Sequence, residues 1–320
     1  MLFYCFMIHF LGIALAGCGG MNIVSSQEQQ LDATKWMALN VYSNVNNEEE
    51  CYTPSQVTLP SGILTITTVA QTTSCSQSTE PYDSGSIVLS PSLNTNGFTS
   101  GNFLYGTVTF TAEMPGGQGP WPAVWLLGHN CHPQNATTYN APTCSWPNPG
   151  SDEIDITEIL GSNHNSDSQC IHSSNGSPCC DPALSDASQN VHNYELDWSP
   201  GTVTWKINGN VTCTNTSPAV PSQSMYLILN VAMGGAGGIP NNSTLPQSMQ
   251  VTQLQISQNG ALIFDGGFSS SHANTASIGP SLAATASGYD ASTLGIVTGK
   301  NLMLPASLSA INPLRHVRRY

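Results

Sequence analysis

Short runs of apolar and β-branched residues recur along the chain, and clusters of Gly, Pro, Asn and Ser separate them. The clearest runs are residues 63–69, 107–111, 203–207 and 225–231. Such runs, bounded by turn-forming residues, are typical of β-strands. After residue 20 the apolar residues show no sustained helical spacing. The pattern therefore predicts an all-β sandwich.

The length of 320 residues fits one large all-β domain with extensions, and no internal repeat is visible. The strand-like runs fall within residues 19–268. Residues 269–320 differ in composition, because they are rich in Ser, Ala, Thr and Gly. We therefore predict one β-rich domain over residues 19–268 and a C-terminal extension to which the sequence assigns no role.

One run combines the strand pattern with three carboxylates: Glu153-Ile154-Asp155-Ile156-Thr157-Glu158. The carboxylates stand at positions i, i+2 and i+5. Side chains at i and i+2 of a strand share a face, whereas the side chain at i+5 points to the opposite face. One extra residue, a β-bulge, would return Glu158 to the face of Glu153 and Asp155.

Three carboxylates on one face repel each other, so the arrangement is costly unless it performs chemistry. A solvated acidic strand edge or a calcium site would be the simpler interpretation of the motif. The surroundings favour chemistry, because the aromatic segment 119–128 precedes the motif and Trp146 lies just before it. Indole rings stack on the C–H faces of sugars, and apolar walls raise the pKa of a carboxyl group. The combination predicts a sugar-binding cleft.

The acidic motif and the Trp-Pro-Ala-Val-Trp-Leu-Leu-Gly segment resemble glycoside hydrolase family 16, in its laminarinase-like (endo-β-1,3-glucanase) branch that carries the bulge. Further segments match the family in order between about Trp36 and about Phe268: residues 47–52, 61–66, 103–108, 191–200, 205–209 and 226–235. The resemblance implies a β-jelly-roll catalytic domain, a sandwich of two antiparallel sheets whose inner sheet curves around a concave substrate cleft.

The resemblance also implies a retaining hydrolase that works by double displacement. Glu153 would be the nucleophile that attacks the anomeric carbon, and Glu158 would be the acid/base that protonates the leaving oxygen and later deprotonates water. Asp155 would hydrogen-bond the nucleophile and tune the pKa of both. Retaining chemistry needs carboxyl groups about 5–5.5 Å apart. Negative neighbours are expected to raise the pKa of Glu158.

Five residues are candidates for substrate binding. Trp121 and Trp125 match the aromatic pair of the family, so we expect at least one ring platform, with core packing as the alternative. Trp146 is a further aromatic candidate. His172 matches the family strand that follows the catalytic one, although a loop histidine is an equal alternative. Asn230 is polar on an apolar strand and should have a partner, either in the fold or in the sugar.

No cofactor is expected. Many family members bind a structural calcium ion through an Asp in the last strand, but this chain has Thr252 there, which makes a structural calcium ion doubtful; no metal-binding residue is predicted. Trp198 and Trp205 are expected to pack in the core.

The chain has six Lys and Arg against 19 Asp and Glu, for a net charge of −13, and three of the six are among the last six residues. Nucleic acid or a sulphated galactan would require a basic surface. The expected partner is therefore a neutral β-glucan polysaccharide, with β-1,3-glucan favoured and mixed β-1,3-1,4-glucan second. A monomer is expected.

Residues 1–18 have the pattern of a targeting segment. The apolar stretch ends in Leu15-Ala16-Gly17-Cys18, which resembles a lipoprotein cleavage site that would leave a lipidated, membrane-anchored Cys18. Ordinary signal-peptide cleavage after Ala16 is the alternative. Both predict a secreted or cell-surface protein. Six Asn-x-Ser/Thr sequons are weak evidence against a bacterial lipoprotein, because they would suit a eukaryotic secreted glycoprotein.

Without Cys5 and Cys18, eight cysteines remain, which suits four disulfides in an oxidising compartment. Cys131–Cys144 is the pairing we favour most. The sequence contains no pair of Cys-x-x-Cys motifs, so a zinc site is not expected.

A protein that binds glucan without cleaving it is the main alternative, and a transglycosylating enzyme is another. Loss of a catalytic Glu would favour the binding protein, but both Glu153 and Glu158 are present. Transglycosylation would use the same residues.

Overall fold

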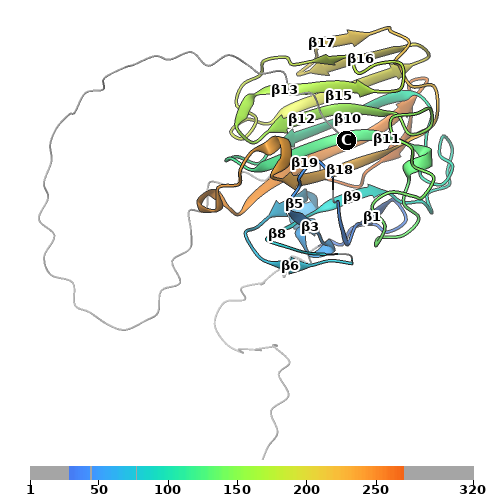
Figure 1. The fold of residues 1–320 in the computed structure, drawn as a ribbon. Helices are drawn as coiled ribbons and strands as arrows, with labels where there is room; N and C mark the ends of the chain where they lie inside the picture. The colour runs from blue at the N-terminus through green and yellow to red at the C-terminus, as the bar shows by residue number, and fades with distance from the viewer. Residues whose placement is uncertain (1–28, 44, 77, 270–320) are drawn as a thin grey trace, which may run out of the picture.

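The computed structural model describes residues 29–43, 45–76 and 78–269, which form a β-sandwich (Figure 1). The predicted targeting segment and residues 270–320 lie outside this described part. Ser269, the last described residue, still donates its backbone N–H to the Gly62 carbonyl oxygen at 2.6 Å.

Seven antiparallel strands form the sheet that carries the acidic motif. In spatial order they are β1 (Trp36–Ala38), β9 (Ser86–Leu89), β18 (Met225–Met233), β11 (Pro120–Gly128), β12 (Glu153–Leu160), β13 (Asn163–His172) and β14 (Cys179–Cys180). The acidic motif thus lies on an inner strand.

Eight strands form the second sheet, again with antiparallel pairing. In spatial order they are β17 (Asn210–Asn215), β16 (Thr202–Ile207), β15 (His192–Ser199), β10 (Gly106–Glu113), β19 (Gln247–Gln258), β5 (Leu64–Thr68) and β4 (Val57–Thr58), with β20 (Ala261–Asp265) paired to β19. An Asn208-Gly209 turn with positive φ at both residues joins β16 to β17, as the twist of a two-residue hairpin requires.

The remaining elements are short. A three-stranded sheet contains β2 (Val41–Tyr42), β3 (Glu50–Tyr52) and β8 (Tyr82–Ser84), and a two-stranded sheet contains β6 (Thr73–Ser74) and β7 (Thr79–Glu80). The helices in the described residues are 3₁₀ turns: η1 (Pro54–Gln56), η2 (Pro60–Gly62), η3 (His129–Cys131), η4 (Gly235–Gly237) and η5 (Asn242–Thr244). No helix in this described part is long and apolar enough to span a membrane.

The two large sheets differ in how their faces are covered. Strands β15 and β16 alternate buried and more exposed side chains, so one face of their sheet packs in the core and the other faces water. All nine residues of β18 and eight of nine in β11 are buried. These inner strands therefore use one face for the core and the other to form the floor of a cleft.

The predicted strands are confirmed with small shifts of their ends, as β5, β10, β16 and β18. Trp198 and Trp205 pack in the core at 2% and 1% exposure, as predicted.

Four disulfides cross-link the described part of the chain, and the favoured Cys131–Cys144 pair is among them. The others are Cys51–Cys75, Cys170–Cys179 and Cys180–Cys213.

Candidate active site

The bulge predicted from the carboxylate spacing is present where β12 pairs with β11. Trp125 lies opposite Asp155 and Val124 lies opposite Thr157, so β12 advances by two residues while β11 advances by one. Ile156 is the extra residue, and it packs in the core at 1% exposure. The bulge reverses the alternation of β12 beyond this point.

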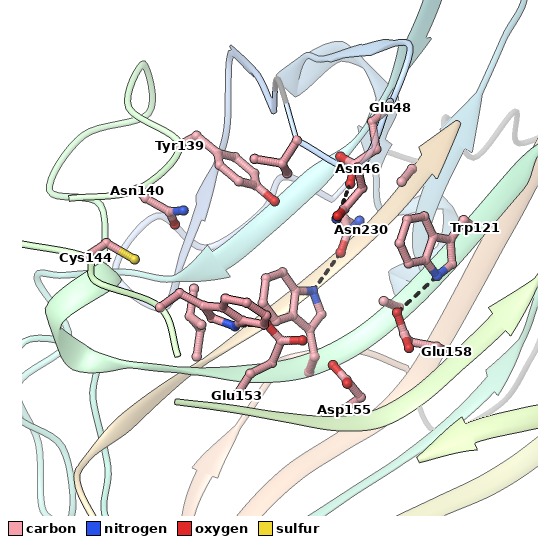
Figure 2. Close-up of a pocket in the computed structure, with 16 residues that line it drawn as sticks. Asn46, Glu48, Trp121, Tyr139, Asn140, Cys144, Glu153, Asp155, Glu158 and Asn230 are labelled. Atoms are coloured by element: carbon pink, nitrogen blue, oxygen red, sulfur yellow. Dashed lines mark hydrogen bonds between the residues drawn. The ribbon is translucent and has the colours of Figure 1, made fainter. Parts of the chain in front are cut away.

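All three carboxylates consequently line the same cleft (Figure 2). A carboxylate oxygen of Asp155 lies within 4.8 Å of one of Glu153, and likewise within 4.8 Å of one of Glu158. Asp155 is 2% exposed and Glu158 is 7% exposed, whereas the Glu153 side chain is 13% exposed. Asp155 therefore lies between the two glutamates, and Glu153 is the more accessible to solvent.

Two indole rings hold the outer carboxylates. Trp146 donates its Nε1–H to Glu153 Oε2 at 2.8 Å. Trp121 donates its Nε1–H to Glu158 Oε1 at 3.1 Å (Figure 2). An N–H donor stabilises the ionised form of a carboxyl group. Each Trp ring thus lines the cleft, and its N–H also positions a carboxylate. Residue type and spacing did not predict this hydrogen-bonding role.

The backbone of Asp155 is fixed from the second sheet. Trp205 on β16 donates its Nε1–H to the Asp155 carbonyl oxygen at 2.8 Å. This hydrogen bond ties the middle carboxylate of the motif to the core.

His172 lies at the end of β13, on the strand next to the acidic motif, and is not a loop residue. It is opposite Glu153 in the sheet and 6% exposed. Its Nε2 lies 3.4 Å from Asp155 Oδ2 and 3.8 Å from Glu153 Oε1. Its ring centroid is 5.7 Å from that of Trp146. The imidazole therefore lies beside the carboxylates of both Asp155 and Glu153.

Asn230 has the partners that its position on an apolar strand predicted. Its Oδ1 accepts from Trp125 Nε1 at 2.8 Å, and its Nδ2 donates to the Tyr52 hydroxyl at 3.0 Å. Trp125 is partly exposed and lines the cleft together with Asn230 (Figure 2). This chain of hydrogen bonds fixes the plane of the Trp125 ring at the cleft floor.

The upper wall of the cleft contains residues that sequence analysis did not identify as site residues. Asn46 and Glu48 line it, and Asn46 Nδ2 donates to Glu48 Oε1 at 3.2 Å (Figure 2). Burial raises the pKa of Glu48, and it raises the pKa of neighbouring Glu50 well above its ordinary value. Three consecutive glutamates, the last of which begins β3, were the available signal for this wall.

A disulfide-stapled loop forms another part of the cleft wall. Tyr139 and Asn140 lie between Cys131 and Cys144 in sequence and line the cleft (Figure 2). Burial raises the pKa of Tyr139 far above its ordinary value, so its hydroxyl stays protonated. Such loop residues follow no periodic pattern, which explains why the sequence did not reveal them.

The loop returns to the acidic strand through a close backbone approach. A Cβ atom on Gly128, at the end of β11, would lie 2.3 Å from the Gly150 carbonyl oxygen. Only glycine fits there. This close contact lies just before the start of β12, and Trp146, in the same loop, hydrogen-bonds Glu153.

Glu153, Asp155 and His172 together offer ligand atoms within 4.8 Å of one another, so they could hold a cation. A cation there would occupy the carboxylates that the resemblance assigns to catalysis. Thr252, where many family members have a calcium-binding Asp, is a buried hydroxyl residue and brings no negative charge. Calcium prefers carboxylate and carbonyl oxygens, so the Thr252 side chain is not a ligand of the kind that calcium favours.

Known proteins resemble this chain in sequence. The sequence profile of Glycosyl hydrolases family 16 matches residues 45–252. Glucan endo-1,3-beta-glucosidase A1 of Niallia circulans is 29% identical over 274 residues, which cover 74% of this chain and 38% of the relative. Endo-1,3-1,4-beta-glycanase EglC of Rhizobium meliloti is 28% identical over 188 residues, covering 58% of this chain and 35% of the relative. The chain thus spans little more than a third of the length of these relatives.

The fold has solved counterparts as well. The LamA catalytic domain from Zobellia galactanivorans superimposes with a TM-score of 0.60 at 26% identity, covering 71% of this chain and 92% of that domain. The profile match contains all three carboxylates of the bulged strand, and the sandwich reproduces the fold of a solved relative. On this evidence the chain belongs to glycosyl hydrolases family 16.

Proposed function

We propose that the protein is a retaining endo-glycoside hydrolase that cleaves β-1,3-glucan. One observation carries the proposal: the bulge in β12 brings Glu153, Asp155 and Glu158 to one cleft floor, with Asp155 within 4.8 Å of both glutamates. A buried group of three carboxylates is costly for stability. Retaining hydrolysis requires two carboxyl groups close together, and Glu153 and Glu158 line the same cleft.

In the first step Glu153 attacks the anomeric carbon, and the bond from that carbon to the glycosidic oxygen breaks. Glu158 transfers its proton to the departing oxygen, so the leaving chain carries a new hydroxyl group. The Trp146 N–H stabilises the ionised form of Glu153 that attacks. The product of this step is a covalent glycosyl ester on Glu153.

In the second step Glu158, now ionised, removes a proton from a water molecule. The water oxygen attacks the anomeric carbon, and the Glu153 ester bond breaks. Two displacements at one carbon restore the original β configuration. A sugar hydroxyl in place of water would give transglycosylation with the same residues.

A neutral glucan suits the cleft because no Lys or Arg is among the described residues that line it. Trp125 and Trp146 offer indole faces for sugar rings. The relatives named above are a glucan endo-1,3-beta-glucosidase and an endo-1,3-1,4-beta-glycanase. We infer β-1,3-glucan as the main substrate and mixed-linkage β-1,3-1,4-glucan as the second.

The test measures reducing-sugar release from laminarin, lichenan and agarose by the purified protein. Glu153→Gln and Glu158→Gln remove the two catalytic roles. Glu195→Gln is the matched control, because Glu195 pairs with Lys206 on β15 and β16, outside the cleft. NMR of the first products reports their anomeric configuration.

The proposal expects hydrolysis of laminarin with β products, lost in both cleft variants and kept in the control. Binding of laminarin without hydrolysis would favour a glucan-binding protein. Longer products than the starting oligosaccharide would favour transglycosylation. Products with α configuration would contradict the retaining mechanism.

We further propose an extracellular monomer, anchored through a lipidated Cys18. Four disulfides support an oxidising compartment. Metabolic labelling with a fatty acid, compared with Cys18→Ala, tests the anchor, and size-exclusion chromatography with light scattering tests the monomer. We also propose that folding needs no calcium, so a chelator should leave the melting temperature unchanged.

A further inference from the structure

We propose that Asp167 is a positioning residue for Glu158: it fixes the β-bulge from the core side and thereby keeps the Glu158 side chain in the cleft. The inference rests on the proposed role of Glu158 as the acid/base. Asp167 is not part of the acidic motif, and nothing in its sequence surroundings marked it as a functional residue.

The geometry around the bulge carries the inference. Asp167 lies on β13 and is fully buried. Its Oδ1 accepts the backbone N–H of Glu158 at 3.1 Å and the hydroxyl of Thr157 at 2.7 Å. The pairing of β12 with β13 shifts register between Ile154 and Glu158, so the regular ladder is interrupted there.

A bulge leaves a backbone donor without its ladder partner, and a buried N–H without an acceptor is destabilising. Asp167 supplies the missing acceptor for the residue that carries the proposed proton donor. The bulged backbone is therefore held at Glu158 itself, on the side opposite the cleft.

Asp167 is in turn held by the second sheet. Gln169 Nε2 donates to Asp167 Oδ2 at 3.0 Å, and Thr212 Oγ1 on β17 donates to Gln169 Oε1 at 2.9 Å. The next residue, Cys213, is bonded to Cys180 on β14. Glu158 is thus connected through one hydrogen-bonded chain to a cross-linked edge of the sandwich.

The charge of Asp167 is not required for this role. Burial raises its pKa to about 8, with the Glu158 carboxyl acting in the same direction. Tyr194 on β15 is the other titratable group that interacts with it, and its pKa is also raised by burial. In acidic to neutral solution a protonated Asp167 still offers Oδ1 as an acceptor. Asparagine should therefore replace it, whereas leucine should not.

The test separates the proton transfer of Glu158 from the rest of the reaction. Laminarin needs a general acid in the first step, because its leaving group is a poor one. A dinitrophenyl β-glycoside of laminaribiose does not need it, because dinitrophenolate leaves without protonation. The value of kcat/KM reports the first step for both substrates, and it is measured for wild type, Asp167→Leu and Asp167→Asn.

We expect Asp167→Leu to lose about 10²-fold in kcat/KM on laminarin, as a catalytic group displaced by about 1 Å does. On the dinitrophenyl substrate the loss should stay below about threefold, because general-acid catalysis contributes little there. Asp167→Asn should recover most of the laminarin activity.

Equal losses on the two substrates would overturn the inference, and so would an unchanged laminarin rate in Asp167→Leu. Asp83→Leu is the matched control for general structural damage, because Asp83 is a buried strand carboxylate that accepts from Thr53 and Gln56. It should lower both rates alike, or neither.

A second variant covers the case in which Asp167→Leu does not fold. Thr157→Val removes the hydroxyl that orients the Asp167 carboxyl and keeps the side-chain shape. It should show a smaller loss that is again confined to laminarin, and a loss shared by both substrates would count against the inference. A wild-type protein that cleaves neither substrate would refute the proposed function itself.

Discussion

Glu153 and Glu158 carry the same functional group, and single side chains set the difference between them. Glu153 is the more exposed and accepts an N–H from Trp146, whereas Glu158 is more buried and accepts one from Trp121. The two environments differ, which suits the different roles proposed for them, Glu153 as nucleophile and Glu158 as proton donor.

Trp146→Phe tests the hydrogen-bond donor to Glu153, the proposed nucleophile. The ring remains, but Glu153 loses a hydrogen bond of the charged kind, worth about 1.5–3 kcal/mol. We expect kcat on laminarin to fall by about tenfold or more, with a smaller change in KM, because each 1.4 kcal/mol is a factor of ten in rate. Steady-state kinetics measures both constants.

Trp198→Phe is the control for that experiment. It also removes one indole N–H, which is donated to the Pro221 carbonyl oxygen at 3.0 Å in the core. It should lower the melting temperature and leave kcat unchanged. If both variants lose kcat to the same extent, the Trp146 hydrogen bond has no specific role.

At the scale of elements, the bulge in β12 decides which carboxylates meet. Ile156 is the residue that the bulge accommodates, and Ile154 is its neighbour in the regular part of the strand. Deleting Ile156 gives carboxylates at i, i+2 and i+4, which share a face on an unbulged strand. Deleting Ile154 instead puts Glu153 and Asp155 on opposite faces.

We therefore expect the Ile156 deletion to keep laminarin hydrolysis within about 10²-fold of wild type, the loss typical of a displaced catalytic group. The Ile154 deletion should abolish hydrolysis. Both remove one fully buried isoleucine, so melting temperatures serve as the common control. Loss of activity in both variants would mean that the bulge itself is required.

The stapled loop is a second functional element. Cys131–Cys144 closes a segment with a sequence separation of 13 that carries Tyr139 and Asn140 into the cleft. Replacing both cysteines by Ala should cost about 3 kcal/mol, the amount expected for a loop of this length. It should also raise KM for laminarin, because the cleft wall becomes less ordered.

Calorimetry and kinetics check that expectation, with the Cys51–Cys75 pair, which does not line the cleft, as control. That pair should affect stability without raising KM. A stapled-loop variant with normal KM would show that the wall does not need the disulfide.

The sequence predicted the strands, the bulge and the carboxylate cluster because each follows from alternation along one strand. It also predicted a partner for Asn230 and core positions for Trp198 and Trp205. It did not predict Asp167, Glu48 or the stapled wall, because their roles depend on which strands and loops become neighbours in space. The three pairings besides Cys131–Cys144 were likewise set by the tertiary fold.

At the scale of the whole molecule, buried acids link stability to pH. Folded Asp167 keeps its proton up to about pH 8, whereas its ordinary pKa is 3.8. Between these values the folded state binds more protons, so the free energy of unfolding falls as pH rises. Burial of Glu48 acts in the same direction. Buried His132, with a pKa lowered to about 4 from 6.5, opposes this below pH 6.5.

We therefore expect the melting temperature to fall between about pH 6.5 and 8, where His132 no longer compensates. Asp167→Asn cannot ionise, so it should make this decline shallower. Scanning calorimetry across the range, in buffers of matched ionic strength, measures both slopes. A decline equally steep in the variant would mean that Asp167 does not control it.

Strands β11 and β18 have buried side chains on both of their faces, one toward the core and one toward the cleft. This affects how substrate specificity can change. On β11 and β18 the cleft receives every second side chain, among them Ala123, Trp125 and Asn230, while their immediate neighbours, such as Val124 and Leu229, fill the core. Substitutions at the cleft-facing positions of each strand can therefore change substrate preference, while the core-facing positions that stabilise the fold stay unchanged. A mutant library restricted to the cleft-facing positions would explore new polysaccharides within a scaffold that stays intact.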